Sequence, residues 1–385
     1  MGYFLEVFLY FNFYCQEMCK ALFYSFPDSL KREFVMKRII YGLLLCLSFG
    51  GCKQEQDGFS AFDSSFRNVR KVIVDNCIKS DLLLGRPFFI EYADSCVFIY
   101  DDLGDSLFVM VDLTERNCVY RFGTRGQGNN EFLQVASLHR MASDSSICTY
   151  DFYRHALSRI DVRNVKQGIK NYAVLKKDSL NSIDMLPTKY GSFIGLGFYE
   201  NTMFSLLREN LTDFFYEYPY RDSRERRISN RLRGMAYQGT LRSAPSLDKF
   251  VFAMNTSPIF MLYTIEKDKI VEQYRWIGSY PVYRTEETEI SRSAPLDASR
   301  PVGFIYAYAT DNYVYLLYSG KSMKDYQADA FTGNVIYQVD WKGNPVRKYV
   351  SDKALSTFCV SDSDEMIYAV AKDNEPTLVK IDLSK

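Results

Sequence analysis

The feature that most constrains the fold is a pattern of short apolar runs and polar turns that recurs from about residue 66 to residue 385. Its clearest copy lies between Pro87 and Thr124, where four runs rich in aromatic and β-branched residues are separated by short turns. The predicted strands are Phe88–Tyr92, Cys96–Asp101, Leu107–Asp112 and Cys118–Phe122. Four antiparallel strands of this length form one blade of a β-propeller.

Five further copies of the pattern follow at intervals of about 45 to 65 residues, a spacing typical of propeller blades with loop insertions. They are Ile147–Asp151 with Ala156–Val162, Phe193–Phe198 with Met203–Leu207, Phe250–Met254 with Ile259–Ile265, Tyr313–Tyr318 with Val335–Trp341, and Met366–Ala371 with Thr377–Leu383. The sequence therefore predicts an all-β fold, a six-bladed β-propeller of four-stranded antiparallel blades over residues 66–385. Because the chain ends inside the last copy, we expect a strand within Val69–Val74 to complete that blade and close the ring.

A lipoprotein signal segment is predicted before the propeller. Met36-Lys37-Arg38 is a charged start, Ile39–Phe49 is a short apolar run, and Gly50-Gly51 precedes Cys52. The apolar run is shorter than the roughly 20 residues that span a bilayer. We therefore expect residues 36–51 to be a cleaved signal peptide and Cys52 to carry lipid, the alternative being a membrane-anchoring helix that is never removed.

The segments on either side of this signal have separate interpretations. Residues 1–35 are expected to be a spurious extension with Met36 as the true start, the alternative being a genuine hydrophobic segment over Tyr3–Phe26. Residues 52–65 read as a polar tether. Lys53, rather than Asp, follows the cysteine, which is similar to lipoproteins sent to the outer membrane. The expected location is the cell envelope, lipid-anchored at the outer membrane, with the periplasmic and surface faces both left open.

The composition argues against several function classes. Lys plus Arg and Asp plus Glu number 47 each, so no overall charge favours nucleic acid as a partner. The chain has two histidines, His139 and His155, which leaves few ways to build a Ser-His-Asp or multi-histidine metal site. We expect no cofactor, no metal site and no catalytic residue.

The cysteines after Cys52, which is expected to carry lipid, are odd in number and show no Cys-x-x-Cys spacing. Each lies in an apolar or strand-like run, which favours small buried side chains, while a bridge joining Cys77 and Cys359 is an alternative in an oxidising envelope. The five are Cys77, Cys96, Cys118, Cys148 and Cys359.

One segment carries a family resemblance. Phe122–Phe132, with the sequence FGTRGQGNNEF, resembles the Phe-Gly-x-x-Gly-x-Gly-Pro-x-Glu-Phe signature of TolB-like six-bladed propeller lipoproteins, with Asn129 in place of Pro. Asp340–Val346 resembles a late blade of that family. The resemblance implies an envelope protein and supplies no catalytic residue. The glycines of the signature are expected to form a crossover between blades, with Glu131 accepting backbone hydrogen bonds, rather than a phosphate-binding loop.

Candidate binding residues are confined to one arginine-rich segment. It is either a solvated insertion or a docking surface for an anionic glycan, lipid headgroup or acidic partner, and its arginines are Arg221, Arg224, Arg226, Arg227, Arg231 and Arg233. The adjacent Asp101 and Asp102 would point to opposite faces of a strand and so are not expected to share a site unless they lie in a turn. Five other acids near strand ends are expected to cap turns, namely Asp112, Asp151, Asp161, Asp340 and Asp382.

We therefore expect a non-catalytic binding or scaffold module, anchored to the membrane by lipid, for a peptide, protein or glycan. The alternative is a hydrolase or lyase acting on carbohydrate or peptide with carboxylates at the propeller funnel.

Overall fold

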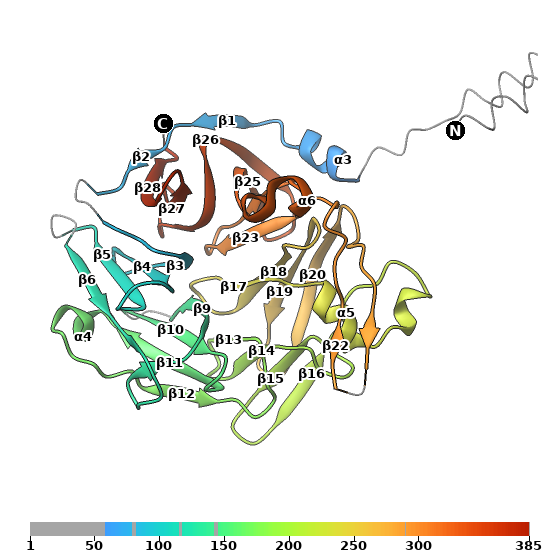
Figure 1. The fold of residues 1–385 in the computed structure, drawn as a ribbon, viewed down its shortest axis with the longest axis horizontal. Helices are drawn as coiled ribbons and strands as arrows, with labels where there is room; N and C mark the ends of the chain where they lie inside the picture. The colour runs from blue at the N-terminus through green and yellow to red at the C-terminus, as the bar shows by residue number, and fades with distance from the viewer. Residues whose placement is uncertain (1–57, 79–81, 115–117, 142–144, 289, 385) are drawn as a thin grey trace, which may run out of the picture. The chain divides into compact units, whose positions relative to one another are not determined.

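The fold is built from antiparallel sheets arranged around a ring (Figure 1). This computed structural model describes residues 58–384 apart from 79–81, 115–117, 142–144 and 289, so the predicted signal segment and Cys52 lie outside the described residues.

Four of the sheets are separate and four-stranded. Their strands are β3 (Pro87–Ala93), β4 (Cys96–Asp101), β5 (Phe108–Asp112) and β6 (Val119–Phe122); β9 (Val135–Arg140), β10 (Ser146–Asp151), β11 (Ala156–Asp161) and β12 (Val174–Lys177); β13 (Asp184–Pro187), β14 (Phe193–Leu196), β15 (Phe204–Leu207) and β16 (Thr212–Phe215); and β17 (Gly239–Ser243), β18 (Lys249–Met254), β19 (Ile259–Ile265) and β20 (Ile270–Ile277).

The remaining part of the ring is one eight-stranded sheet in which a single long strand belongs to two groups. The first half of β26 pairs with β25, and its second half, from Leu355, pairs with β27. The strands of this sheet are β23 (Phe304–Ala309), β24 (Tyr313–Tyr318), β25 (Gly333–Asp340), β26 (Pro345–Val360), β27 (Met366–Lys372), β28 (Pro376–Asp382), β1 (Val69–Val72) and β2 (Asp75–Asn76).

The N-terminal strand closes the ring with different residues from those expected. Val69–Val72 forms β1, which pairs in parallel with Lys348–Ser351 of β26. The strand that joins β28 is β2, whose two residues pair antiparallel with Val379 and Lys380. The strand that pairs with β28 and closes the ring therefore lies just after the predicted segment, because Val69–Val72 pairs with β26 instead.

The first strand of each group lies innermost, and these strands contact one another around the ring in the order β3, β9, β13, β17, β23 and the second half of β26. Many strands are buried along their whole length, as in β4, β5, β10 and β23. Neighbouring sheets cover both faces of such a strand, so its sequence is mostly apolar and does not alternate, as in β5 (FVMVD). The core is therefore a series of layers between sheets.

Helix α3 (Gly58–Ser65) adds a covering layer to the outer edge of the ring. Phe62 is buried, and its ring centroid lies 4.3 Å from that of Trp276 and 5.2 Å from that of Tyr337. Phe59 stacks on Tyr318 with centroids 4.0 Å apart. The second half of the expected tether, residues 58–65, thus belongs to the folded body, because its two phenylalanines bury apolar area against the sheets.

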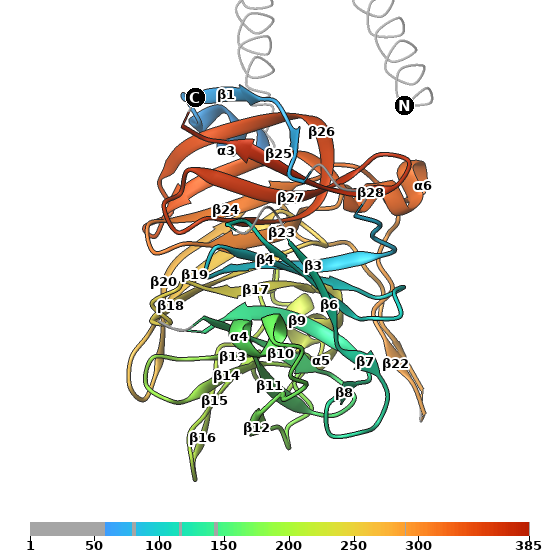
Figure 2. The same cartoon turned by 90° about the vertical axis from the view of Figure 1, so that its left-hand side faces the viewer.

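Four insertions gather on one side of the ring, which we call the insertion face. Antiparallel strands alternate in direction, so connections from a fourth strand to the next first strand, and from a second to a third strand, all emerge on the same side. Figure 2 shows α6, β22 and the β7–β8 pair on this side. The insertions are 123–134 with β7 (Thr124–Arg125) and β8 (Glu131–Phe132), 216–238 with η1 (Glu225–Arg227) and α5 (Asn230–Ala236), 278–303 with β21 (Glu286–Glu287) and β22 (Arg292–Ser293), and 319–332 with α6 (Met323–Tyr326) and η2 (Gln327–Phe331).

The helices are few and short. The remaining one, α4 (Val162–Lys166), starts at Asp161, whose carboxylate accepts hydrogen bonds from the first turn. Within the described ranges, no helix has the length and apolar character needed to cross a bilayer. The five cysteines after Cys52 form no disulfide within the described residues, so Cys77 and Cys359 are not bridged; Cys118 is exposed and the other four are buried. Burial raises the pKa of Cys77 to about 11.

Candidate functional site

Polar side chains from different innermost strands meet at the centre of the ring, and we call them the axial cluster. These residues are buried although they are polar or charged. The exposed fractions run from 1% for His139 to 8% for Asp184. The cluster comprises Glu91 of β3, Ser137 and His139 of β9, Asp184 of β13, Arg242 of β17, and Tyr306 and Tyr308 of β23.

Asp184 anchors one half of the axial cluster. Its Oδ1 atom accepts hydrogen bonds from Ser137 Oγ at 2.5 Å and from the backbone N–H of Met185 at 2.6 Å, and lies 2.8 Å from His139 Nε2. The other ring nitrogen of His139, Nδ1, faces Arg242 at 3.5 Å. Within this cluster the serine and the histidine both bind the carboxylate and not each other, so the arrangement lacks the nucleophile-to-base hydrogen bond of a Ser-His-Asp triad.

Arg242 and Glu91 form the other half. The Arg242 guanidinium donates to the Tyr306 hydroxyl and lies 4.9 Å from the centroid of that ring. Tyr308 donates its hydroxyl to Glu91 Oε1 at 2.5 Å. Burial raises the pKa of Glu91, opposed by the positive charge of Arg242. Burial also disfavours the charge of Arg242, but Tyr306 and Glu91 hold its pKa above the ordinary value.

The axial cluster brings two carboxylates from different sheets together with a guanidinium, which is the residue set of an acid–base site. Both carboxylates, however, already accept hydrogen bonds inside the cluster and are only 3% and 8% exposed. A substrate would need an opening to reach them, and none of these residues lines the pocket described below. In the described part of the chain, no group of His, Cys, Asp and Glu side chains is placed to hold a metal ion.

The glycine-rich segment forms the crossover that the sequence predicts. Gly123 has a φ of 71°, and the backbone N–H of Gly128 donates to Glu131 Oε2 at 2.8 Å. A Cβ atom on Gly126 would lie 2.0 Å from the same carboxylate oxygen, so a larger residue there would displace the Glu131 side chain from its bond to Gly128. The segment joins two strands through β7 and β8, which explains its residues without a bound phosphate.

The five strand-end acids predicted to cap turns each accept a hydrogen bond from a backbone N–H two or three residues later, as Asp340 does from Lys342 at 2.9 Å. The adjacent pair Asp101 and Asp102 is bonded differently. Asp101 accepts from the backbone N–H groups of Gly85 and Arg86 at 2.8 and 2.7 Å, whereas Asp102 pairs with Arg125 at 2.6 Å. The two adjacent carboxylates therefore have separate partners.

The arginine-rich segment is held in place by its own acids. Glu217 lies 2.7 Å from Arg233 and 3.3 Å from Arg226, and both guanidiniums lie over the ring of Tyr220, at 5.4 and 5.2 Å from its centroid. Arg233 is 1% exposed and also donates to the carbonyl of Arg226. It is therefore a structural residue and not part of an outward surface.

Two further acids of this segment are also used internally. Glu225 is buried and accepts from the Tyr237 hydroxyl at 2.9 Å and from the backbone N–H of Arg221 at 2.5 Å. Asp222 accepts from the backbone N–H of Arg224 at 2.8 Å, and this bond is the second-largest cause of the lowering of the pKa of Asp222, after its bond to the backbone of Glu225. Five arginines remain exposed on the insertion face, namely Arg221, Arg224, Arg226, Arg227 and Arg231.

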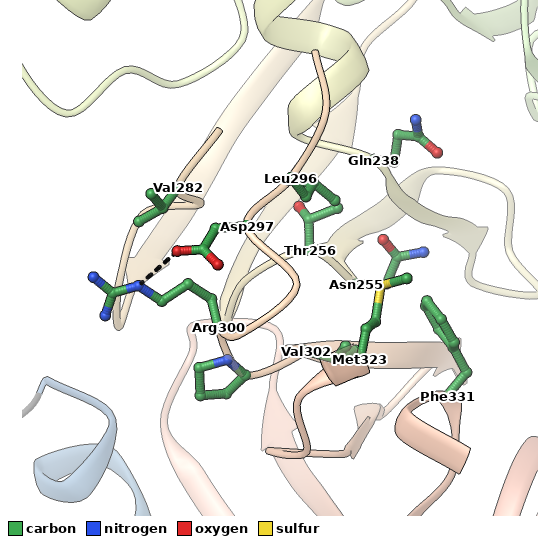
Figure 3. Close-up of a pocket in the computed structure, with 11 residues that line it drawn as sticks. Gln238, Asn255, Thr256, Val282, Leu296, Asp297, Arg300, Val302, Met323 and Phe331 are labelled. Atoms are coloured by element: carbon green, nitrogen blue, oxygen red, sulfur yellow. Dashed lines mark ion pairs between the residues drawn. The ribbon is translucent and has the colours of Figure 1, made fainter. Parts of the chain in front are cut away.

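A pocket of about 230 Å³ opens on the insertion face, between the sheet of β17–β20 and the start of the eight-stranded sheet (Figure 3). In Figure 3, Asp297 and Arg300 lie on one side, Met323 and Phe331 lie on the other, and Thr256 lies between them. The Arg300 guanidinium is 4.0 Å from Asp297, a loose ion pair. The apolar lining comprises Val282, Leu296, Pro301, Val302, Met323 and Phe331.

The polar part of the pocket comes from the segments that begin β17 and join β18 to β19. The backbone N–H of Asn255 donates to the carbonyl of Gln238 at 3.0 Å, and its carbonyl accepts from Gly303 at 2.7 Å, which fixes the Asn255 side chain at the pocket. The buried Thr256 Oγ1 has no hydrogen-bond partner among the described residues. A buried hydroxyl without a partner is unfavourable unless a ligand or water meets it.

Sequence reasoning identified the arginine segment but missed both the axial cluster and the pocket. A usable signal for the axial cluster was a charged residue inside an apolar strand, as at Glu91 and Arg242. The pocket had no such signal, because three separate insertions supply its lining.

Comparisons with curated proteins and with solved structures give at most distant similarity. No curated protein matches it. Among solved structures, a Bacteroides fragilis protein described as exported has 10% identity and a TM-score of 0.49, covering 82% of this chain and 98% of that chain. An auxiliary nutrient binding protein from Bacteroides thetaiotaomicron has 10% identity and a TM-score of 0.49, covering 80% and 75%. Regucalcin, a calcium-binding protein from Agrobacterium tumefaciens, has 10% identity and a TM-score of 0.45, covering 82% and 95%.

The family model described as TolB-like 6-blade propeller-like matches residues 62–363, which is most of the chain and includes the glycine-rich crossover. The chain belongs to the TolB-like six-blade propeller-like family.

Proposed function

We propose that this protein is a lipid-anchored binding module of the cell envelope that holds a peptide, protein or glycan at its insertion face without transforming it. The ring is proposed to have six blades, with the two halves of β26 assigned to neighbouring blades and β2 completing the last one. The anchor is proposed to be lipid on Cys52, and the location the outer membrane.

The observation that carries this proposal is the contrast between the two candidate sites. At the axis, polar side chains bond one another and are buried. On the insertion face, the pocket exposes apolar side chains and contains the unpartnered hydroxyl of Thr256. Each site contains one buried atom without a partner among the described residues, Arg242 Nε at the axis and Thr256 Oγ1 at the pocket, so exposure distinguishes them: a ligand can reach the apolar side chains of the pocket, whereas the axial groups are buried.

An enzyme remains the second candidate because of Glu91 and Asp184. Carboxylates from two sheets beside Arg242 are the groups that a hydrolase or lyase acting on carbohydrate or peptide would use. This function would require the ring to open along its axis.

The exposed arginines are proposed to help dock an anionic partner. Glu217 pairs with Arg226 at 3.3 Å and Asp222 with Arg221 at 3.8 Å, which leaves Arg224, Arg227 and Arg231 without an ion pair among the described residues. Guanidinium groups bind carboxylate and phosphate groups through paired hydrogen bonds.

A binding assay with a product analysis tests the function. The full-length chain is mixed with peptides and glycans released enzymatically from bacterial envelopes, and amide hydrogen exchange and product masses are both measured. We expect slower exchange in 216–238, 278–303 and 319–332 with no new product, and the same result for Glu91→Gln. New products that disappear in Glu91→Gln would establish the enzyme instead.

The anchor is tested separately by the intact mass of the protein extracted from membranes, with and without an inhibitor of signal peptidase II. We expect a mature species that begins at lipid-modified Cys52, replaced by a longer species under inhibition. A chain that keeps residues 1–51 and carries no lipid would contradict the proposed anchor and leave the propeller unaffected.

A further inference from the structure

The pocket on the insertion face has the size and lining of a site for one side chain of a peptide. We propose that the pocket receives a large apolar side chain of a peptide, such as leucine, methionine or phenylalanine, while Asn255 and Gln238 form hydrogen bonds with the adjacent peptide backbone. This inference rests on the proposed binding function.

The volume favours a single group over an extended ligand. At about 230 Å³ the pocket is smaller than the roughly 300–1,000 Å³ of sites that enclose a whole small molecule. A longer ligand would place one group inside and the rest across the insertion face.

The apolar lining favours a hydrocarbon or aromatic group in that position. Leu296, Met323 and Phe331 are 36%, 41% and 42% exposed, so three large apolar side chains face solvent at one pocket. Isolated exposed apolar residues are ordinary, but a contiguous group around a pocket indicates a binding surface. Methionine also adapts its shape to different side chains.

The polar lining matches the backbone of a peptide. Asn255 carries both a donor and an acceptor, and so does Gln238, whose amide nitrogen already donates to the carbonyl of Met235 at 2.9 Å and whose amide oxygen is left to accept. The Thr256 hydroxyl adds a buried donor and acceptor. A peptide unit offers one N–H and one C=O, which is the complement of such a set.

A sugar ring fits this lining less well. Its hydroxyl groups point outward around the whole ring, so half of them would meet the apolar wall without hydrogen bonds. Phe331 is the one aromatic side chain in the pocket lining, and no second ring faces it to stack on a sugar.

The experiment uses saturation-transfer NMR on the full-length chain in detergent with three probes: N-acetyl-leucinamide, N-acetyl-serinamide and N-acetylglucosamine. The blocking variant is Met323→Trp, in which an indole occupies the pocket from the exposed helix α6. The matched control is Tyr326→Trp, because Tyr326 lies on the same helix, is 52% exposed and does not line the pocket. Leu296→Trp blocks the pocket from the opposite wall and keeps the test valid should the first variant misfold.

We expect signal from the leucine methyl groups with the wild type and with Tyr326→Trp. We expect it to fall in Met323→Trp and Leu296→Trp to the level of the serine amide. Unchanged signal in both blocking variants, or no leucinamide signal at all, would overturn this inference. Signal from N-acetylglucosamine that the blocking variants abolish would also overturn it while leaving the binding function in place, and product formation in the envelope assay would overturn the function itself.

Discussion

Replacing Arg242 by methionine is expected to reduce the free energy of unfolding by about 3–5 kcal/mol, the range for removing one partner from a buried charged group. Arg242 is 2% exposed and interacts electrostatically with Tyr306, Glu91 and Asp184. Methionine approximates the length of the side chain but not its charge. The substitution therefore leaves two buried carboxylates without their shared cation, and the measurement is urea unfolding of the full-length chain.

A surface arginine provides the matched control. Arg231 lies on α5 and is exposed, so Arg231→Met should change the same free energy by no more than about 0.5 kcal/mol. Arg242→Lys keeps the charge but loses the planar set of donors, and should fall between the two. A loss below about 1 kcal/mol for Arg242→Met would mean that the axial cluster is solvated and that its charges are screened.

Much of the fold could be predicted from the sequence because each sheet is local in the chain. The strands over Pro87–Phe122 match their predicted limits to within a residue, since polar turns interrupt the apolar runs. Ring closure was predicted less well. Val69–Val74 has a strand-like sequence, but whether it joins β26 or β28 depends on contacts with residues more than 270 positions away, which local pattern cannot determine.

Residues 52–65 were predicted to be a tether because of their polar composition. This prediction is wrong for the second half, residues 58–65, which form helix α3. Residues 58–65 are short and polar enough to read as a linker, yet Phe59 and Phe62 face aromatic rings of β20, β24 and β25. Aromatic residues in an otherwise polar segment were the available signal.

In the candidate sites, too, some features could be predicted from the sequence and others could not. The capping role of Asp340 and the bonding role of Glu131 followed from turn chemistry within a few residues. The burial of Arg233 did not, because it depends on Glu217 and Tyr220 lying across the same insertion. The axial cluster required knowing which strand of each group is innermost, and the pocket required the folded positions of three insertions.

The central claim is that the axis of the ring is closed and that ligands meet the insertion face. The two histidines of the chain allow a direct test, because His139 lies in the axial cluster at 1% exposure while His155 lies half-buried in the turn between β10 and β11. A buried core group reacts only when the structure opens, which slows its modification by roughly 10³-fold or more for a domain with about 5 kcal/mol of stability.

The measurement is the rate at which diethyl pyrocarbonate modifies each histidine in the native full-length chain, read by peptide mass spectrometry, with the urea-unfolded chain as control. We expect His155 to react readily and His139 to react at least about 10³-fold more slowly. We expect unfolding to remove this difference in rate. Comparable rates at the two histidines in the native protein would show an open axis. That result would contradict the closed propeller and favour a catalytic centre at Glu91 and Asp184.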